Sequence, residues 1–317
     1  MTPGAPPTTP PTERRNPRTT DIDTRGSGDV LRLILAEDEH AVRAALAAAD
    51  DLARAVDATH ERLRRGGRVH YFGAGASGRL AVLDATEITP TFGAPRELFT
   101  AHFAGGAAAV ADSSIDREDA ADAGAADAAG LDGSSTAVGI TASGSTPYVA
   151  GALRAARAAG ALTVLVTCNP AAPLRGDADI AVVADTGPEA LTGSTRLKAG
   201  TATKVVLNAF STTLMIKAGR TYGNLMVGLV ATNAKLDVRA VALLAEATGA
   251  DDDTCRSALS DAGGRIPEAL VRLLTGCPPE RARAALSADP SVRAAVAALS
   301  APDPRGSFAR PDGPKRG

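Results

Sequence analysis

The central part of the chain alternates between two hydrophobic patterns. Short continuous apolar runs recur, and between them apolar residues return at the three-to-four-residue spacing of an amphipathic helix. The runs expected to form strands are residues 68–72, 98–103, 136–140, 162–166 and 180–183. A long helix is expected over residues 198–217. Strands that alternate with helices predict an α/β fold, in which a parallel sheet is sandwiched by helices.

Helical spacing alone characterises the regions on either side of this alternation. Between residues 30 and 65 it predicts a helical extension that ends at Gly66-Gly67. The apolar positions that define this extension are Val42, Leu46, Leu52, Val56 and Leu63. From residue 236 to 300 the strand signals vanish, and short segments rich in alanine and leucine replace them. We therefore expect a main domain over residues 29–235 and a small C-terminal helical subdomain over 236–300.

Both ends of the chain are rich in proline and poor in large apolar side chains. Residues 1–17 contain six prolines, and the segment from residue 301 onward contains four more. Such segments bury too little apolar surface to offset the entropy lost when a chain becomes ordered. We expect a disordered or extended segment over residues 1–28 and a disordered tail over 301–317.

Composition narrows the classes of partner. The net charge is -2 and aromatic residues make up only 3% of the chain, so a nucleic-acid partner is not expected. No apolar run approaches the roughly 20 residues of a membrane-spanning helix, and the first residues lack a signal-peptide pattern. Three scattered cysteines and four unclustered histidines predict neither a disulfide framework nor a metal site. We expect a cytoplasmic protein with no membrane partner and no metal.

Two loops rich in glycine and hydroxyl groups, residues 73–78 and 141–146, each join a predicted strand to a predicted helix. Unpaired N–H groups at a helix N-terminus attract an anion, and parallel strands bring both loops to one edge of the sheet. The candidate binding residues are Ser77, Gly78, Ser143, Gly144, Ser145 and Thr146. We expect a phosphorylated small molecule as the ligand. The alternative is that these glycines only permit tight turns, and a lone GxGxxG pattern at 73–78 is a weak dinucleotide signal.

Two carboxylates are candidates for acid–base chemistry. Glu87 precedes Pro90 and is expected near the C-terminus of the helix that begins close to Ser77. The helix dipole there disfavours a charged carboxylate, which suits a general acid. Glu118 lies in an acidic stretch over residues 112–127. For each of them the alternative is a solvated carboxylate on an exposed helix face, and spacing alone does not decide between the two.

One long motif connects these features. Residues 187–204, GPEALTGSTRLKAGTATK, resemble the signature shared by N-acetylmuramic acid 6-phosphate etherases and the glucokinase regulatory protein family. Further motifs resemble the etherase branch and follow in the same order; they are TERRNP at 12–17, GAGASGRL at 73–80, DATE at 84–87, ASGSTPY at 142–148, YGNLMV at 222–227 and ATNAKL at 231–236. The resemblance therefore covers roughly residues 12–236.

The resemblance implies a sugar-isomerase (SIS) domain with a flavodoxin-like sheet, and a homodimer in which the partner completes each active site. The implied reaction cleaves the D-lactyl ether of N-acetylmuramic acid 6-phosphate, a phosphosugar, by elimination and then water addition. It yields N-acetylglucosamine 6-phosphate and D-lactate in cell-wall amino-sugar recycling, without a cofactor. Glu87 is implied as the acid that protonates departing lactate, and Glu118 as the base at C2. Three cations are expected either to bind phosphate or the lactyl carboxylate or to form structural ion pairs: Arg196, Lys198 and Lys235.

Two other functions stay open at this point. A regulator would bind a phosphosugar without turnover, as the glucokinase regulatory protein does, but that protein has two SIS domains and this chain has one set of loops. A phosphosugar aldose–ketose isomerase would share the anion-binding loops, but it would not explain the motif at 187–204.

Overall fold

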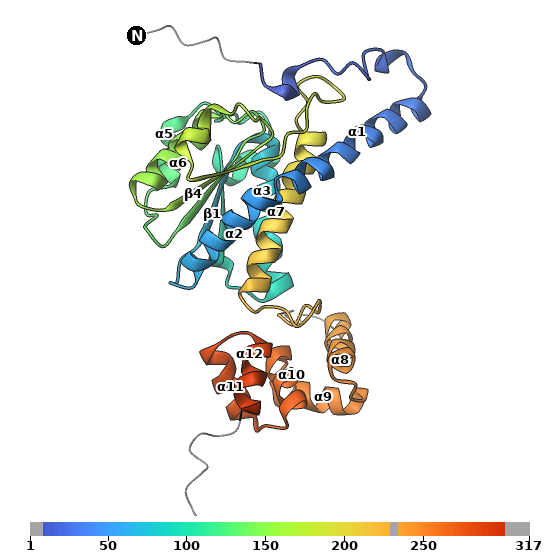
Figure 1. Cartoon of the computed structure of the whole chain (residues 1–317), viewed down its shortest axis with the longest axis vertical. Helices are drawn as coiled ribbons and strands as arrows, with labels where there is room; N and C mark the ends of the chain where they lie inside the picture. Colours follow the sequence, from blue (N-terminus) through green and yellow to red (C-terminus); the bar gives the residue numbers. More distant parts are fainter. Residues whose placement is uncertain (1–8, 229–233, 302–317) are drawn as a thin grey trace, which may run out of the picture. The chain divides into compact units, whose positions relative to one another are not determined.

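A five-stranded parallel sheet forms the centre of the first part of the chain (Figure 1). The computed structural model describes residues 9–228 and 234–301. The strands are β1 Val69–Gly73, β2 Phe99–Phe103, β3 Thr136–Ile140, β4 Leu162–Thr167 and β5 Ile180–Val183, in the order β2-β1-β3-β4-β5. This is the flavodoxin-like order, so the predicted fold class is confirmed. Gly73 pairs with both Phe103 and Ile140, which brings the carboxyl ends of β1, β2 and β3 to one edge.

Helices cover both faces of this sheet. The helices and short 3-10 turns of this part are η1 Pro11–Glu13, η2 Ile22–Thr24, α1 Ser27–Ala47, α2 Ala49–Leu63, α3 Gly75–Phe92, η3 Arg96–Leu98, α4 Gly106–Ala111, α5 Ala121–Asp127, α6 Pro147–Ala158, η4 Pro173–Asp177 and α7 Lys198–Lys217. In Figure 1, α5 and α6 lie on one side of the strands, and α2, α3 and α7 lie on the other. Phe72, Leu153 and Leu165 belong to the core under α6.

The N-terminal extension differs from its predicted form. The pattern over residues 30–65 becomes two helices, α1 and α2, separated at Ala48. Alanines fill the buried face of α1, which lets it pack closely on α7. As a result the predicted apolar positions Val42 and Leu46 are 55% and 74% exposed. Leu31 and Leu35 continue this exposed apolar stripe, one helical turn apart.

The segment before α1 is ordered from residue 9 onward. Thr12 and Asn16 are buried. The Asn16 side-chain amide donates to the Pro188 carbonyl oxygen, and the Thr19 hydroxyl donates to that of Ala190 at 2.8 Å. Residues 9–28 therefore differ from the expected disordered or extended segment, because the loop before α7 supplies hydrogen-bond partners that proline content does not reveal. Residues 1–8 and 302–317 lie outside the described residues.

The chain divides into two compact units, residues 1–217 and 218–317. The second unit contains the helices α8 Ala234–Thr248, α9 Asp252–Asp261, α10 Ile266–Thr275, α11 Pro279–Ala288 and α12 Val292–Ser300. Tyr222, Leu225 and Val227 pack into its apolar core. The boundary between the two units therefore lies after residue 217. The loss of strand signals had predicted a later boundary, after residue 235. Within the described ranges, no helix has the length and apolar character required to span a bilayer.

His70 of β1 and His102 of β2 form a pair of histidines on neighbouring strands of the sheet. His70 Nδ1 and His102 Nε2 are 3.1 Å apart, and the His102 ring stacks on Phe72. One nitrogen must accept the hydrogen of the other, so at least one ring is neutral. Burial, and then the charges of His102 and Arg68, lower the pKa of His70 to about 4.

We expect acidification to destabilise the protein through this pair. His70 titrates near 6.5 in the unfolded chain, so the stabilisation by the neutral ring is complete above that pH. It is lost as the pH falls towards about 4. His70→Gln should flatten the dependence of the unfolding free energy on pH across this interval. Urea unfolding of both proteins at several pH values measures the effect, and parallel pH dependences would contradict it.

Candidate active site

A ring of hydroxyl groups surrounds the loop between β3 and the N-terminus of α6. The hydroxyl oxygens of Thr141 and Thr146 are 2.8 Å apart. Those of Ser143 and Ser145 are 2.9 Å apart. The Asn169 side-chain amide donates to the Ser143 carbonyl oxygen at 2.8 Å and holds the loop from the end of β4. Hydroxyl donors at a helix N-terminus form a site suited to a phosphate group.

Glu118 lies beside this loop. The Thr146 hydroxyl donates to the Glu118 carboxylate at 3.1 Å, and the Tyr148 backbone N–H donates to the backbone carbonyl oxygen of Glu118 at 2.9 Å. A cavity of about 150 Å³ is lined by Glu118 together with Gly75 and Arg79, which belong to the start of α3. The structure therefore brings Glu118 together with both predicted loops, at the carboxyl edge of the sheet.

Two glycines among the predicted binding residues pack against protein. A Cβ atom at Gly78 would come within 2.6 Å of the Phe103 ring, so this glycine allows α3 to approach β2. A Cβ atom at Gly144 would come within 2.2 Å of the Ala172 side chain, and Gly144 has a φ of +70°. Both glycines are buried, whereas Ser77 is half-buried and Ser145 is exposed. Close helix packing therefore accounts for Gly78 and a left-handed turn accounts for Gly144, and the serines remain available to a ligand.

Glu87 lies on a different part of α3. The helix continues to Phe92 with Pro90 inside it, so it extends beyond Glu87, which was expected near its C-terminus. The side chain of Glu87 is exposed at the mouth of a cavity of about 320 Å³ between α3 and α7. The polar residues that line this cavity are Asp84, Glu87, Thr91, Lys204, Asn208, Ser211 and Thr212.

The two candidate catalytic carboxylates lie far apart within one copy of the chain. Gly75 lines the cavity of Glu118, and Glu87 lies 12 residues further along the same helix. At 1.5 Å per residue this separation is about 18 Å along the helix axis. One amino-sugar phosphate is too small to contact both ends of α3 at once. Within one copy of the chain, Glu87 and Glu118 therefore line two different cavities.

Asp84 is buried one helical turn before Glu87. The Tyr71 hydroxyl donates to one oxygen of its carboxyl group at 2.8 Å, and the Ser211 hydroxyl donates to the other at 2.9 Å. Burial raises the pKa of Asp84 to about 6, against the opposing effects of these two hydrogen bonds and of the Lys204 charge. These contacts tie α3 to β1 and α7, and so fix the helix turn that carries Glu87.

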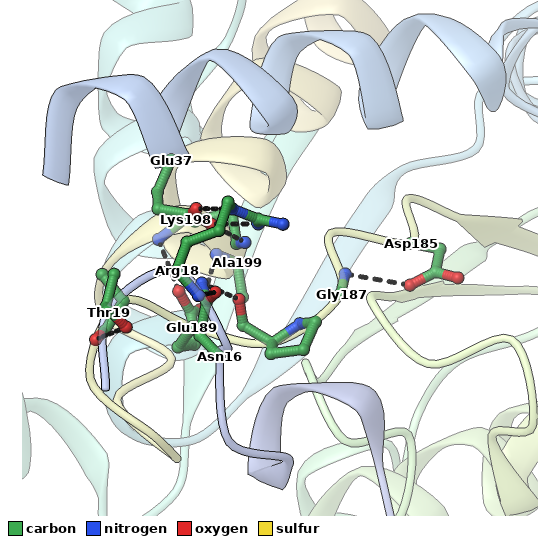
Figure 2. Close-up of polar contacts among 11 residues, drawn as sticks. Asn16, Arg18, Thr19, Glu37, Asp185, Gly187, Glu189, Lys198 and Ala199 are labelled. Carbon is green, nitrogen blue, oxygen red and sulfur yellow. Dashed lines mark hydrogen bonds and ion pairs between the residues drawn. The ribbon is translucent and has the colours of Figure 1, made fainter. Parts of the chain in front are cut away.

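The motif at 187–204 forms a buried polar network (Figure 2). The Glu189 carboxylate accepts the backbone N–H groups of Lys198 and Ala199 at 3.1 and 2.9 Å, which caps the N-terminus of α7. The Lys198 ammonium, 1% exposed, donates to Glu37 at 2.6 Å. Arg18 donates through Nε to Oε1 of Glu37 and through a second nitrogen to Oε2, the oxygen that also accepts from Lys198. Lys198 thus forms a structural ion pair and has no surface left for a ligand in this arrangement.

The other two predicted cations have different outcomes. Arg196 is exposed and forms no ion pair with any residue that the structure describes. The backbone of Lys235 belongs to α8, but its side chain lies outside the described residues. No group of three or more potential metal-ligating side chains occurs within the described part of the chain.

Sequence reasoning overlooked three residues of these networks: Asp84, Lys204 and Glu37. Asp84 belongs to the DATE motif at 84–87 and Lys204 to the motif at 187–204. Their positions within these motifs, on α3 and α7, could have indicated them from the sequence. Glu37 had no such signal, because it lies in a charged helix and its partner Lys198 is 161 residues away. Only the fold brings these two charges together.

Comparison with known proteins identifies the class first. Residues 51–157 match the model of the glucokinase regulatory protein N-terminal SIS domain. A solved phosphoheptose isomerase from Francisella tularensis is 17% identical with a TM-score of 0.46, covering 61% of this chain and 100% of that one. The family-model match therefore shows that residues 51–157 are similar to an SIS domain.

Curated relatives narrow this class to one family. An N-acetylmuramic acid 6-phosphate etherase of Thermobifida fusca is 54% identical over 265 residues, which cover 84% of this chain and 87% of that protein. An etherase of the same name from Deinococcus radiodurans is 50% identical over 268 residues, covering 84% of this chain and 88% of the relative. The chain belongs to the N-acetylmuramic acid 6-phosphate etherase family.

Proposed function

We propose that this protein hydrolyses N-acetylmuramic acid 6-phosphate to N-acetylglucosamine 6-phosphate and D-lactate in amino-sugar recycling. The observation that carries the proposal is the pair of carboxylate cavities at the two ends of α3, one of them beside a hydroxyl-rich anion site. The relatives that bear this name at 54% and 50% identity support the substrate assignment. We place the reaction in the cytoplasm, which is consistent with three unpaired cysteines.

The phosphate anchors the substrate at the hydroxyl groups of Ser143, Ser145 and Thr146, with Ser77 on the neighbouring loop. Ring opening exposes an aldehyde at C1, which acidifies the proton on C2. Glu118, which the Thr146 hydroxyl links directly to the phosphate loop, removes this proton. Binding energy from the remote phosphate positions the reacting carbons against the carboxylates.

Elimination then breaks the bond between C3 and the ether oxygen. Glu87 donates a proton to this oxygen, so lactate leaves as an alcohol rather than as an alkoxide. Water adds to C3 of the unsaturated aldehyde, a proton returns to C2, and the product is N-acetylglucosamine 6-phosphate. No electrons are exchanged with a cofactor in this sequence, and each carboxylate ends in its starting protonation state.

We further propose that each active site is shared by two copies in a homodimer. One copy supplies the phosphate loop and Glu118, and the other supplies Glu87, because within one copy these carboxylates line different cavities along α3. The exposed apolar stripe of α1, formed by Leu31, Leu35, Val42 and Leu46, supports an association that buries it. A two-fold dimer would form two equivalent sites of this kind.

The second candidate function is a regulator that binds the phosphosugar without turnover. The wild-type protein incubated with N-acetylmuramic acid 6-phosphate in D₂O separates the two. We expect D-lactate and N-acetylglucosamine 6-phosphate that carries deuterium at C2. Binding of the phosphosugar without lactate release would support the regulator.

Glu118→Gln should abolish both lactate release and exchange of the C2 proton, because the amide cannot accept that proton. A loss of about 10²-fold or more is expected for removal of a general base. The matched control is Asp122→Asn, an exposed acid in the same stretch, which should keep wild-type rates. Asp119→Asn tests the neighbouring carboxylate. Loss of exchange in Asp119→Asn but not in Glu118→Gln would assign the base to Asp119 instead.

A further inference from the structure

The cavity beside Glu87 has a strongly polar wall formed by one face of α7. Lys204, Asn208 and Ser211 project from this helix at positions separated by one turn. On the opposite wall, α3 contributes Asp84 and Glu87. An ammonium group thus lies in the same cavity of about 320 Å³ as the proposed acid.

Lys204 is not neutralised by a partner within the described chain. It is exposed and forms no ion pair within 4.0 Å with any residue that the structure describes. The nearby Asp84 carboxyl group instead accepts the hydroxyl groups of Tyr71 and Ser211. The other two lysines of α7 are engaged, since Lys198 pairs with Glu37 and Lys217 pairs with Asp57 at 2.9 Å. Lys204 is therefore the lysine of α7 that remains able to pair with an anion.

The substrate chemistry places an anion in this cavity. In a lactyl ether, one carbon bears both the ether oxygen and the carboxylate. A group that protonates the ether oxygen therefore lies within a few ångströms of that carboxylate. Without a cation, the carboxylate would face Asp84 and, once its proton has been given to the ether oxygen, Glu87, and repulsion between like charges would disfavour this arrangement.

We propose that Lys204 binds the carboxylate of the D-lactyl group and aligns the ether oxygen with Glu87. The assignment rests on the proposed etherase function. It makes Lys204 a determinant of specificity for an acidic ether substituent, because a sugar phosphate without the lactyl group has no carboxylate to pair with this cation. Asn208, one turn further along α7, adds a neutral hydrogen-bond donor to the same wall.

The test compares two substrates that differ only in the charge of the lactyl group: N-acetylmuramic acid 6-phosphate and its lactyl carboxamide. For Lys204→Met, kcat/KM on the carboxylate substrate should fall about tenfold to a hundredfold, the loss expected for a charge-assisted hydrogen bond. On the carboxamide, Lys204→Met and wild type should agree within about twofold. Lys204→Arg should restore most of the activity on the carboxylate. Lys217→Met is the matched control on α7 and should discriminate between the substrates as wild type does.

Exchange of the C2 proton of N-acetylglucosamine 6-phosphate with D₂O provides a readout that needs no lactyl group. This rate should be unchanged in Lys204→Met, which shows that the variant is folded and binds the phosphosugar. If Lys204→Met lost activity equally on both substrates, or lost none on the carboxylate substrate, the assignment of Lys204 would be overturned. The proposed etherase function would still stand if the wild-type protein released lactate. If wild type released no lactate from either substrate, the proposed function and the role of Lys204 would both be overturned.

Discussion

Glu87→Gln should release D-lactate about 10²- to 10⁴-fold more slowly than the wild-type protein, the range expected when a general acid is removed. The glutamine amide preserves the size of the side chain but has no proton to give to the ether oxygen. Removal of the C2 proton precedes departure of lactate and uses Glu118. The variant should therefore still exchange the C2 proton of N-acetylmuramic acid 6-phosphate with D₂O. Lactate release and deuterium incorporation, followed in the same reaction, measure both steps.

The control for this experiment is Glu97→Gln. Glu97 is an exposed carboxylate that follows α3 in the chain and does not line the cavity. Its substitution should leave both rates unchanged. Full lactate release by Glu87→Gln would remove the acid role from Glu87, even with the family membership unchanged. Loss of exchange together with lactate release would show that Glu87 acts before or during deprotonation of C2.

Glu37→Gln should cost about 3–5 kcal/mol of unfolding free energy, the range measured when one partner of a buried ion pair is removed. Glu37 and Lys198 are 5% and 1% exposed, so the substitution leaves a buried ammonium without its counter-charge. Burial alone would raise the pKa of Glu37, but hydrogen bonds from Arg18 and Lys198 and the Lys198 charge outweigh it and lower the pKa to about 2. Urea unfolding monitored by circular dichroism gives the free-energy difference.

Two comparisons make this prediction specific. Glu39→Gln removes an exposed carboxylate that pairs with Arg43 on the same helix, and we expect little change from it. The stability that Glu37 contributes should be complete above about pH 4.5 and be lost as the pH falls towards 2, because its folded pKa is the lower one. If Glu37→Gln had the same unfolding free energy as wild type and a raised KM for the phosphosugar, a ligand-binding role for Lys198 would be favoured over the structural one.

The sheet and α7 were predictable because their patterns are local. All five apolar runs became strands within one residue of their expected bounds, and α7 has the bounds expected from its spacing. Apolar runs between turn-forming residues leave few alternatives to a buried parallel strand. The hydroxyl-rich loop at 141–146 was predictable for the same reason, because its position after a strand determines its place at the sheet edge.

The packing of α1 and the fate of each cation were not predictable in this way. Apolar spacing at Val42 and Leu46 predicted a helix, but it did not show that these side chains are exposed and that the alanines at 41, 44 and 45 are buried. Lys198 and Lys204 differ by six positions on one helix, and no local pattern shows that only Lys198 meets a buried carboxylate. Such pairs depend on contacts between distant parts of the chain.

Mixing of two inactive variants tests the shared active site most directly. Glu87→Gln and Glu118→Gln are purified separately, unfolded together in equal amounts and refolded. In a mixed dimer one site carries both substitutions and the other carries neither, so random pairing predicts about a quarter of wild-type lactate release. Each variant refolded alone should remain inactive. If the mixture stays as inactive as its components while refolded wild-type protein recovers its activity, the active site is not shared between copies.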